Sequence, residues 1–524
     1  MQIFSFSPFG YEGALVAVEV DLRRGIPAVD VVGLADGAVK ESRERMRSAI
    51  RNSGFPFPVE RVLISLSPAD LKKEGAGFDL ALALAVLWAN DHKGDGDCAR
   101  DVPSEAVLVM GELELSGALR PVKGVNAAAT TAAQAGITRC VVSAANGAEA
   151  REVRGMRVFA AENLADAYAA LSRPDLFTCG GQGERASVSP DAVSVAGVPF
   201  PALRADDDMR DVAGQPRLVR ALQVAAAGGH NVLAFGPPGC GKTLAMRRFP
   251  SLLPLLTVEE AQSVTRVHSV AGLLSPQQPL IRESPFRQPH QTASIEGICG
   301  GGVQCRPGEI SLAHNGVLFL DEAAEFRTSV LQMLRVPLES GEVSLSRAGR
   351  TTTYPARFQL LLATNPCPCG NYGVSEKLCL CSARSVEQYW RKFSGPLLDR
   401  VDIRVPVAVP DEQSEEAAYR RSSESLRGEI ARAVAAQRAR QGIRNAHLDP
   451  QDMARWCRLG KDEQSFLDAA VAANDFSPRA VSGCLKLART LADMDGSRNI
   501  AVTHLKEAIG LRRNEGPFAL FGDV

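Results

Sequence analysis

The chain has 524 residues, 23% of them charged, and a formal net charge of -1. This length allows two or three domains with separate cores, and the near-neutral charge excludes a protein that coats nucleic acid with its whole surface. Any contact with DNA must therefore come from a local patch, a loop or a pore.

The N-terminus lacks the basic start and apolar run of a signal peptide. The most apolar helical stretch, Leu80 to Ala89, is much shorter than the roughly 20 residues that cross a bilayer. We therefore expect a cytoplasmic protein without membrane contact, whose 12 cysteines are reduced thiols or metal ligands rather than disulfides.

Residues 1–171 predict an α/β domain. Apolar runs and period-2 alternation indicate strands at Leu15–Asp21, Ala28–Val32, Arg61–Ser65 and Ala106–Met110. Helical spacing indicates helices at Ala38–Asn52, Asp79–Trp88 and Gly124–Ala135. The first helix has a basic face that could touch nucleic acid, although a solvated helix face is the favoured interpretation.

The character of the chain changes after this domain. Residues 172–205 are rich in Gly, Ser and Pro with little periodicity, which predicts a linker. A second α/β domain is expected over 206–409, and a mainly helical region over 410–524.

A phosphate-binding loop is predicted directly after the short apolar strand Val232–Phe235. The next residues, GPPGCGKT, match the pattern G-x-x-x-x-G-K-[ST] between a strand and a helix. Glycines let backbone N–H groups surround phosphates at a helix N-terminus. We expect Lys242 to neutralise the β- and γ-phosphates of ATP and Thr243 to ligate Mg²⁺. The predicted nucleotide-binding residues are Gly236, Pro237, Pro238, Gly239, Cys240, Gly241, Lys242 and Thr243.

Two further strands end in polar residues suited to the same chemistry. Gly316–Glu322 is an apolar strand that ends in two acids, which predicts Asp321 as a Mg²⁺ ligand and Glu322 as the general base for the attacking water. Phe358–Ala363 is followed by Asn365, which we expect to position that water and sense the γ-phosphate. A turn-forming Asn before proline is the alternative.

Two arginines are candidates for stabilising transition-state charge. Arg400 in GPLLDRVDI matches an arginine finger that reaches the γ-phosphate of a neighbouring subunit, an element worth about 10³–10⁵ in rate. Arg479 in FSPRA lies at a helix start and fits a sensor-2 role, with an ordinary surface residue as the alternative.

Longer blocks carry a specific family resemblance. PFRQPHQTASIEGICGGG, ATNPCPCGNYG, GPLLDRVDI and VVGLADGAVKESRERMRSAI resemble the magnesium-chelatase-like AAA+ ATPases, and within them the ComM/YifB family, over nearly the whole chain. The resemblance implies an α/β fold with an N-terminal Lon-protease-like domain, a P-loop AAA+ module of the helix-2-insert type and a helical C-terminal lid. It also implies a hexameric ATPase that promotes DNA branch migration in natural transformation and binds single-stranded or branched DNA independently of sequence.

The chain departs from the Lon pattern at its catalytic dyad. Gly77 stands where the resemblance implies the nucleophilic serine, and Asn126 where it implies the lysine. A Ser–Lys dyad needs a hydroxyl and an amine, so Lys72, Lys73 and Lys123 have no hydroxyl at position 77 to activate. We therefore expect no peptidase activity, and a domain that organises the oligomer or contacts DNA.

Two insertions are candidates for contacting DNA through its phosphates, without reading bases. The first, about Ser284 to Pro307, contains Arg287 on a glycine-rich loop. The second, Gly341–Pro355, predicts a β-hairpin with Arg347 and Arg350 at its tip, and the alternative is a hairpin that is merely exposed to solvent.

Four cysteines follow Asn365 in two closely spaced pairs. Cys367, Cys369, Cys379 and Cys381 offer the four thiolates of a tetrahedral Zn²⁺ site. The C-x-C spacing is tighter than the usual C-x₂₋₄-C, so a reduced, turn-rich loop stays the alternative.

Three other functions are considered from the sequence. One is a chelatase-type ATPase that inserts a metal into a porphyrin, and another is a protein-remodelling or Lon-like proteolytic partner, which the missing dyad weakens. The third is a non-catalytic regulatory scaffold, against which the intact Glu322 argues.

Overall fold

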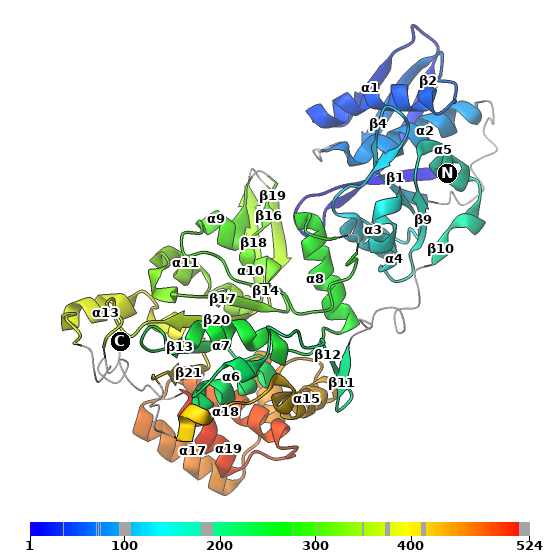
Figure 1. The fold of residues 1–524 in the computed structure, drawn as a ribbon. Coiled ribbons are helices and arrows are strands. Elements are labelled where there is room, and N and C mark those ends of the chain that lie inside the picture. Colours follow the sequence, from blue (N-terminus) through cyan, green and yellow to red (C-terminus); the bar gives the residue numbers. More distant parts are fainter. Residues whose placement is uncertain are drawn as a thin grey trace.

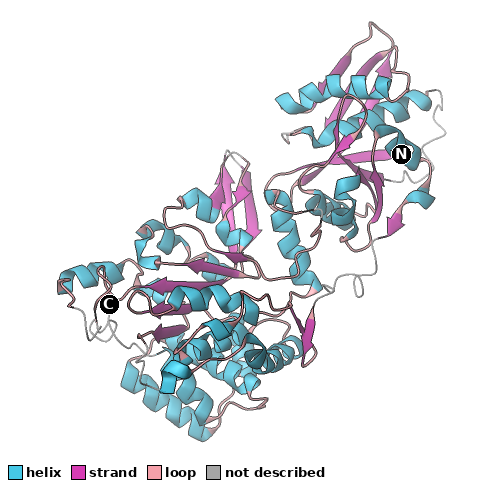
Figure 2. Cartoon of the chain, viewed as in Figure 1, coloured by secondary structure: helices cyan, strands magenta, loops and turns pink. Residues whose placement is uncertain are grey.

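The computed structural model describes residues 1–34, 36–69, 71, 73, 75–93, 106–179, 192–275, 277–302, 304–347, 350–372, 378–409 and 415–512. An N-terminal α/β unit is followed by a second α/β unit and a helical C-terminal region (Figure 1). Helices lie on both sides of the two large sheets (Figure 2). Within these ranges, every helix is too short or too polar to cross a membrane.

The N-terminal unit is built on a mixed sheet of eight strands in the order β10-β9-β8-β5-β1-β2-β4-β3. The strands are β1 (Gln2–Ser7), β2 (Ala14–Arg23), β3 (Val29–Val32), β4 (Arg61–Ser67), β5 (Ala106–Met110), β8 (Arg139–Ser143), β9 (Arg157–Ala161) and β10 (Thr178–Cys179). The helices are α1 (Gly37–Asn52), α2 (Asp79–Asp91), α3 (Val125–Gln134), α4 (Gly147–Arg151) and α5 (Leu164–Leu171), and β6 (Glu112–Leu113) and β7 (Leu119–Arg120) form a small hairpin. The strands and helices predicted here are confirmed, with small shifts at their ends.

Successive side chains of the central strand β5 point to opposite faces of the sheet, and helices cover both faces. In β5, Val107 and Val109 face a core shared with α1, α2 and α5, whereas Leu108 and Met110 face a core shared with α3 and α4. A strand buried on both faces is continuously apolar, as β5 is. Helix α2 is buried from Asp79 to Leu87, which accounts for its apolar sequence.

The second unit is built on a parallel sheet of five strands in the order β14-β17-β20-β13-β21. The strands are β13 (Val232–Phe235), β14 (Phe286–Arg287), β17 (Val317–Leu320), β20 (Gln359–Thr364) and β21 (Ile403–Pro406). The helices of this unit are α6 (Pro216–Gly228), α7 (Lys242–Arg248), α8 (Val258–Ala271), α9 (Ile295–Cys299), α10 (Glu309–Leu312), α11 (Thr328–Met333), α12 (Pro337–Ser340), α13 (Ala383–Arg391) and α14 (Gly395–Leu398).

Three small hairpins project from this unit. They are β11 (Val193–Val195) with β12 (Val198–Phe200), β15 (Gly300–Gly301) with β16 (Arg306–Pro307), and β18 (Glu342–Arg347) with β19 (Arg350–Pro355). The last one confirms the hairpin predicted for Gly341–Pro355. The β15–β16 hairpin separates α9 from α10.

The C-terminal region is helical, as predicted, and shares a core with the second sheet. It contains α15 (Ser423–Arg440), α16 (Pro450–Trp456), α17 (Lys461–Asn474), α18 (Pro478–Met494) and α19 (Val502–Arg512). Apolar residues of α15, α18 and α19 join those of α6 and of one sheet face in a single cluster. This packing fixes the start of α18, which carries Arg479, relative to the sheet.

The predicted linker, 172–205, is too wide. Strand β10 pairs with β9 on one side, and on the other side Val198 and Phe200 are buried in the core of the second unit. The low periodicity of this stretch hid three short strands, because each is only two or three residues long. The central part, 180–191, lies outside the described residues.

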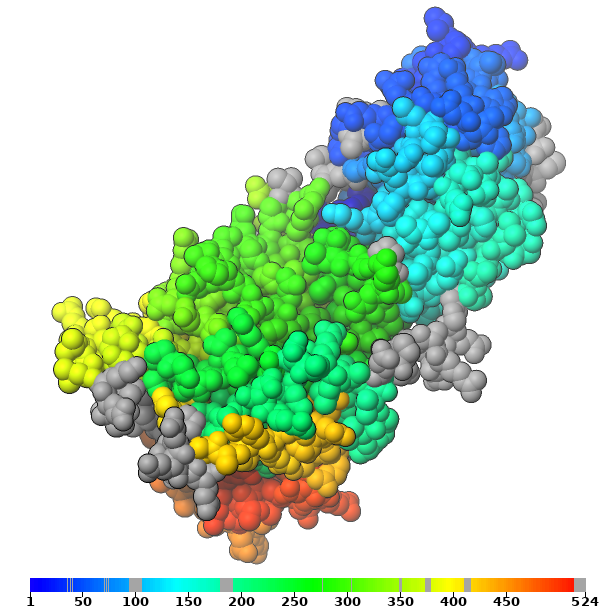
Figure 3. Space-filling model, in the orientation of Figure 1, coloured from blue at the N-terminus to red at the C-terminus, as the bar shows by residue number. Residues whose placement is uncertain are grey.

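The two α/β units meet along α8, whose N-terminus is held by a capping box of Thr257 and Glu260. Arg266 on α8 lies over the ring of Tyr11, 4.4 Å from its centroid, and donates to the carbonyl oxygens of Tyr11 and Glu12. The space-filling view shows the surface of the N-terminal unit, blue to cyan, in contact with the green surface of the second unit (Figure 3).

Candidate functional site

The loop after β13 has the shape that its glycines allow. The chain leaves the sheet at Gly236, where an added Cβ would lie 1.9 Å from the carbonyl oxygen of Val407. Gly239 and Gly241 have φ values of 82° and 86°, in the left-handed region that favours glycine. Helix α7 then begins at Lys242. The buried amide of Gln215 donates to the carbonyl oxygen of Cys240 at 3.0 Å and so supports the loop from below.

Lys242 and Thr243 begin the helix and face the neighbouring strands. The Lys242 ammonium is buried and donates to the carbonyl oxygens of Gly236 and Pro237, both at 2.7 Å. The Thr243 hydroxyl donates to Oδ1 of Asp321 at 3.1 Å. The hydroxyl and the carboxylate predicted as Mg²⁺ ligands are therefore adjacent.

Glu322 adopts an uncommon backbone conformation at the end of β17. Its φ is 49° and its ψ is 46°, which is left-handed for a residue other than glycine and costs about 1–3 kcal/mol. Its N–H donates to Asp321 Oδ1 at 3.1 Å. This conformation turns the chain sharply, so that both acids border the same space. Strain of this kind is concentrated at functional sites.

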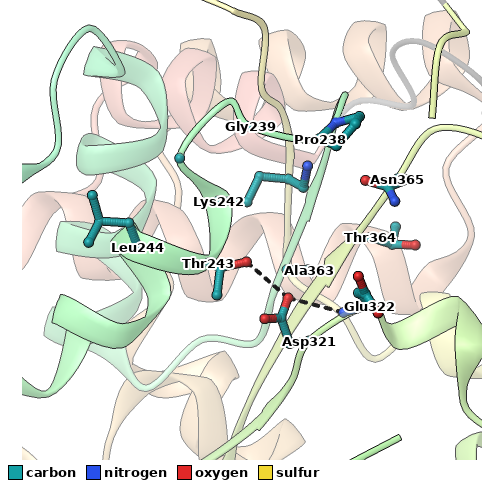
Figure 4. A pocket seen from close by; sticks show the side chains of 11 residues that line it. Pro238, Gly239, Lys242, Thr243, Leu244, Asp321, Glu322, Ala363, Thr364 and Asn365 are labelled. Atoms are coloured by element: carbon teal, nitrogen blue, oxygen red, sulfur yellow. Dashed lines mark hydrogen bonds between the residues drawn. The ribbon is translucent and has the colours of Figure 1, made fainter.

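These residues line one cavity of about 340 Å³ at the carboxyl ends of β13, β17 and β20. Figure 4 shows Lys242 and Thr243 on one side, facing Asp321, Glu322 and Asn365 on the other. The full lining is Pro238, Gly239, Gly241, Lys242, Thr243, Leu244, Asp321, Glu322, Ala363, Thr364 and Asn365. A crevice at the carboxyl ends of parallel strands is the usual ligand site of such sheets.

The two candidate arginines lie elsewhere. The described residues that line the cavity include neither Arg400 nor Arg479. Both guanidinium groups contact the carboxylate of Glu339 on α12, and Arg479 does so at 2.9 Å. Sequence reasoning missed Glu339, because an acid in a short helix carries no pattern of its own. Gln215, which directly precedes α6, was also missed, because a single polar residue outside a motif carries no pattern either.

Of the arginines predicted to contact DNA, Arg347 of the hairpin is exposed, whereas Arg287 of the first insertion is held in an ion pair. Arg347 is exposed at the end of β18, whereas the side chain of Arg350 lies outside the described residues. Arg287 was expected on a flexible loop, and this is wrong. It lies in β14 at the edge of the parallel sheet and donates twice to Glu309, at 2.6 and 2.8 Å. A half-buried arginine in a bidentate ion pair is not free to follow a phosphate backbone.

The four predicted cysteines come together. The Sγ atoms of Cys367, Cys369, Cys379 and Cys381 all lie within 4.8 Å of one another. The Sγ–Sγ distance is 3.4 Å for Cys367–Cys369, 3.7 Å for Cys367–Cys379 and 3.6 Å for Cys369–Cys379. The backbone N–H of Asn371 and the neighbouring thiol of Cys367 lower the pKa of Cys369 to about 6. The cluster can therefore hold a metal ion.

The cysteine cluster adjoins this cavity. An added Cβ at Gly370, where φ is 78°, would lie 2.9 Å from Pro238 of the phosphate-binding loop. Cys367 is fully buried and follows Asn365 by two residues. Gly370, directly after the first cysteine pair, therefore packs against the loop that borders the cavity.

In the N-terminal unit, the two positions that the resemblance assigned to a Ser–Lys dyad, Gly77 and Asn126, hold no hydroxyl and no amine. Gly77 lies in a short turn before α2, and an added Cβ there would have its nearest neighbour, Val122, at 4.0 Å. Asn126 is buried on α3, and its N–H donates to Glu149 at 2.8 Å. The buried amine of Lys73 donates to the carbonyl oxygen of Pro68, and Lys72 lies outside the described residues.

Comparisons with known proteins match almost the whole chain. The family described as subunit ChlI of Mg-chelatase matches residues 18–146, magnesium chelatase subunit ChlI matches 208–416, and the ChlI C-terminal family matches 420–512. The chain is 39% identical to YifB of Escherichia coli over 96% of its own length and 95% of that protein. It is 38% identical to the competence protein ComM of Haemophilus influenzae over 97% of each. The magnesium-chelatase 38 kDa subunit of Acidiphilium rubrum matches 30% of the chain at 29% identity.

Proposed function

Because the chain belongs to the ComM/YifB family of magnesium-chelatase-like proteins, we propose that it is a Mg²⁺-dependent ATPase that forms a hexameric ring and drives branch migration of DNA in natural transformation. The observation that carries the ATPase part is the one cavity shared by Lys242, Thr243, Asp321, Glu322 and Asn365. A cation, two Mg²⁺ ligands, a carboxylate base and an amide are the groups that phosphoryl transfer needs.

Each of these residues has a role in the proposal. Thr243 Oγ1 and Asp321 Oδ1 are hard oxygen ligands 3.1 Å apart, so they fit Mg²⁺, which neutralises phosphate charge when bound. Lys242 exchanges the carbonyl oxygens of its own loop for the β- and γ-phosphates. Glu322 takes the proton of the attacking water, and Asn365 orients that water.

The DNA part of the proposal is supported by the hairpin β18–β19 and by the printed name of one relative, competence protein ComM. Arg347 is exposed near the hairpin tip, where it can contact phosphates without reading bases. We interpret the β15–β16 hairpin between α9 and α10 as the helix-2 insert, and the N-terminal unit as a Lon-like domain without peptidase chemistry.

ATP turnover with and without single-stranded or forked DNA tests this function, together with junction migration on a three-stranded substrate. We expect DNA to raise turnover and ATP to be required for migration. Lys242→Ala should abolish nucleotide use, and Glu322→Gln should bind ATP but lose about 10²–10⁴-fold in turnover. If DNA leaves the rate of ATP turnover unchanged and no junction migration occurs, a chelatase-type or protein-remodelling ATPase would instead be favoured.

We also propose that the four cysteines bind Zn²⁺ as a structural ion. A tetrahedral site with Zn–S bonds of about 2.3 Å separates its sulfur atoms by about 3.8 Å. The Sγ–Sγ distances of 3.4, 3.7 and 3.6 Å in the structure are close to this value, so the donor set fits. Elemental analysis of purified protein should find one zinc per chain, and none in Cys379→Ser/Cys381→Ser. Cys457→Ser, which removes a buried thiol of the helical region, is the matched control. Equal metal content in all three would contradict the site.

A further inference from the structure

Three segments far apart in the sequence converge on one carboxylate. Glu339 lies on α12, Arg400 follows α14, and Arg479 is in the first turn of α18. One carboxylate oxygen of Glu339 accepts from Nη2 of Arg400, and the other accepts from Nη2 of Arg479 at 2.9 Å. The two arginines are 61 and 140 residues from Glu339 along the chain, so only tertiary packing brings them together.

Two of the three side chains of this cluster, Glu339 and Arg479, are open to a neighbouring molecule. The Glu339 side chain is 58% exposed and that of Arg479 is 46% exposed, whereas Arg400 is 11% exposed. Arg400 Nη1 also donates to the carbonyl oxygen of Pro396, and its buried Nε has no hydrogen-bond partner in the described part of the chain. An arginine has five N–H donors, so each guanidinium group has more donors than these contacts use, and those of Arg479 are the more exposed.

The negative charge of Glu339 allows the two arginines to lie close together. Two guanidinium groups held on the two oxygens of one carboxylate are close enough to repel each other, and the acid between them offsets that repulsion. The same two cations hold the pKa of Glu339 below its ordinary value, Arg400 more than Arg479. Neither arginine is among the described residues of the chain's own nucleotide cavity, so the pair is available to a triphosphate bound elsewhere.

We propose that Glu339 is a positioning residue whose carboxylate holds Arg400 and Arg479 side by side, so that both reach the triphosphate bound by an adjoining copy of this chain. This inference rests on the proposed ATPase ring. Glu339 touches no phosphate itself. It sets the distance and orientation of the two cations that neutralise transition-state charge.

Steady-state ATP turnover by the full-length chain tests this role. Glu339→Gln keeps the size of the side chain but removes its charge, so we expect kcat to fall at least tenfold while KM for ATP stays within twofold. Glu339→Asp keeps the charge and should recover part of the loss. Glu342→Gln is the matched control, because Glu342 is exposed on the adjoining strand and makes no ion pair within the described residues.

A second measurement separates positioning from a structural role. If Glu339 acts through the arginines, Arg479→Ala should cost much less in the Glu339→Gln background than in the wild-type chain. Light scattering and thermal unfolding should show intact assembly in Glu339→Gln. Unchanged or raised kcat in Glu339→Gln, additive effects in the double variant, or failed assembly that Glu339→Asp shares would each overturn the proposal. A wild-type chain without ATP turnover would instead overturn the proposed function.

Discussion

His314 shows how one buried side chain makes stability depend on pH. It is 4% exposed, its Nδ1 accepts the backbone N–H of Arg357, and its Nε2 contacts the hydroxyl of Ser263. Burial, and to a smaller extent Arg357, lowers its pKa from an ordinary value of 6.5 to about 3. Because the folded pKa is the lower one, protons bind the unfolded chain more readily. The stabilising contribution is therefore complete above pH 6.5 and is lost as the pH falls.

We predict that lowering the pH from 7.5 to 5 reduces the free energy of unfolding of the second unit by about 2 kcal/mol through this group. Chemical denaturation at both pH values measures the loss. His314→Gln should be less stable at pH 7.5 but should lack this part of the pH dependence. His290→Gln changes an exposed imidazole of the same unit and should behave as the wild type. The same pH dependence in His314→Gln would show that His314 does not cause it.

At the scale of elements, the hairpin β18–β19 is anchored at its base and exposed at its far end. Tyr354 is fully buried and donates to the carbonyl oxygen of Cys305, and its ring packs edge-on against Tyr11. Thr352 accepts the N–H of Tyr11. The outer strand residues are polar, with hydroxyl pairs such as Ser346–Thr351 across the strands. A fixed base and a polar outer end suit an element that contacts a moving polymer.

We predict that Arg347→Ala weakens DNA binding with little effect on ATP turnover in the absence of DNA. The logarithm of the binding constant falls linearly with the logarithm of the salt concentration. Loss of one phosphate contact should make this slope shallower by about one unit for each subunit that contacts the DNA. Fluorescence anisotropy with labelled single strands over a salt series measures this. Arg391→Ala, on α13 with Glu387 as its ion-pair partner, is the matched control. An equal salt slope in Arg347→Ala and wild type would exclude this contact.

At the scale of the whole molecule, the N-terminal unit is joined to the second unit by polar and aromatic contacts. Ser269 of α8 donates to Glu149, and the stem of Lys123 packs against Gly272, the residue that caps α8. The loop that holds Tyr11 contacts both α8 and the hairpin strand β19. The N-terminal unit therefore contacts the hairpin directly through Tyr11.

The proposed ring predicts complementation between two inactive variants. The Arg400→Ala chain keeps an intact phosphate-binding loop but lacks the arginine finger. The Lys242→Ala chain keeps the arginine finger, Arg400, but lacks a working loop. In rings mixed at equal ratio, about a quarter of the interfaces pair an intact loop with an intact finger, so part of the ATP turnover should return. Co-purification of two differently tagged chains provides such rings for the turnover assay. No recovery in rings proven to contain both chains would exclude action across the interface.

Much of the molecule was predictable from local pattern. The continuous apolar strands, the helices of the N-terminal unit and the hairpin at Gly341–Pro355 each carry their own periodicity or turn residues. Short elements were not predictable, because two or three residues cannot show a period. The strand β14 therefore appeared as part of a loop, which made Arg287 look available to DNA.

Residue types and short spacings define the reactive groups of the chain: the G-x-x-x-x-G-K-[ST] loop, two acids at a strand end, two pairs of cysteines, and no hydroxyl at position 77. These features do not depend on the rest of the fold. Which of the groups meet depends on long-range packing. Strands β13, β17 and β20 are neighbours in the sheet but distant in sequence, so their ends form one cavity. Glu339 joins Arg400 and Arg479 for the same reason, since long-range packing leaves no local signal.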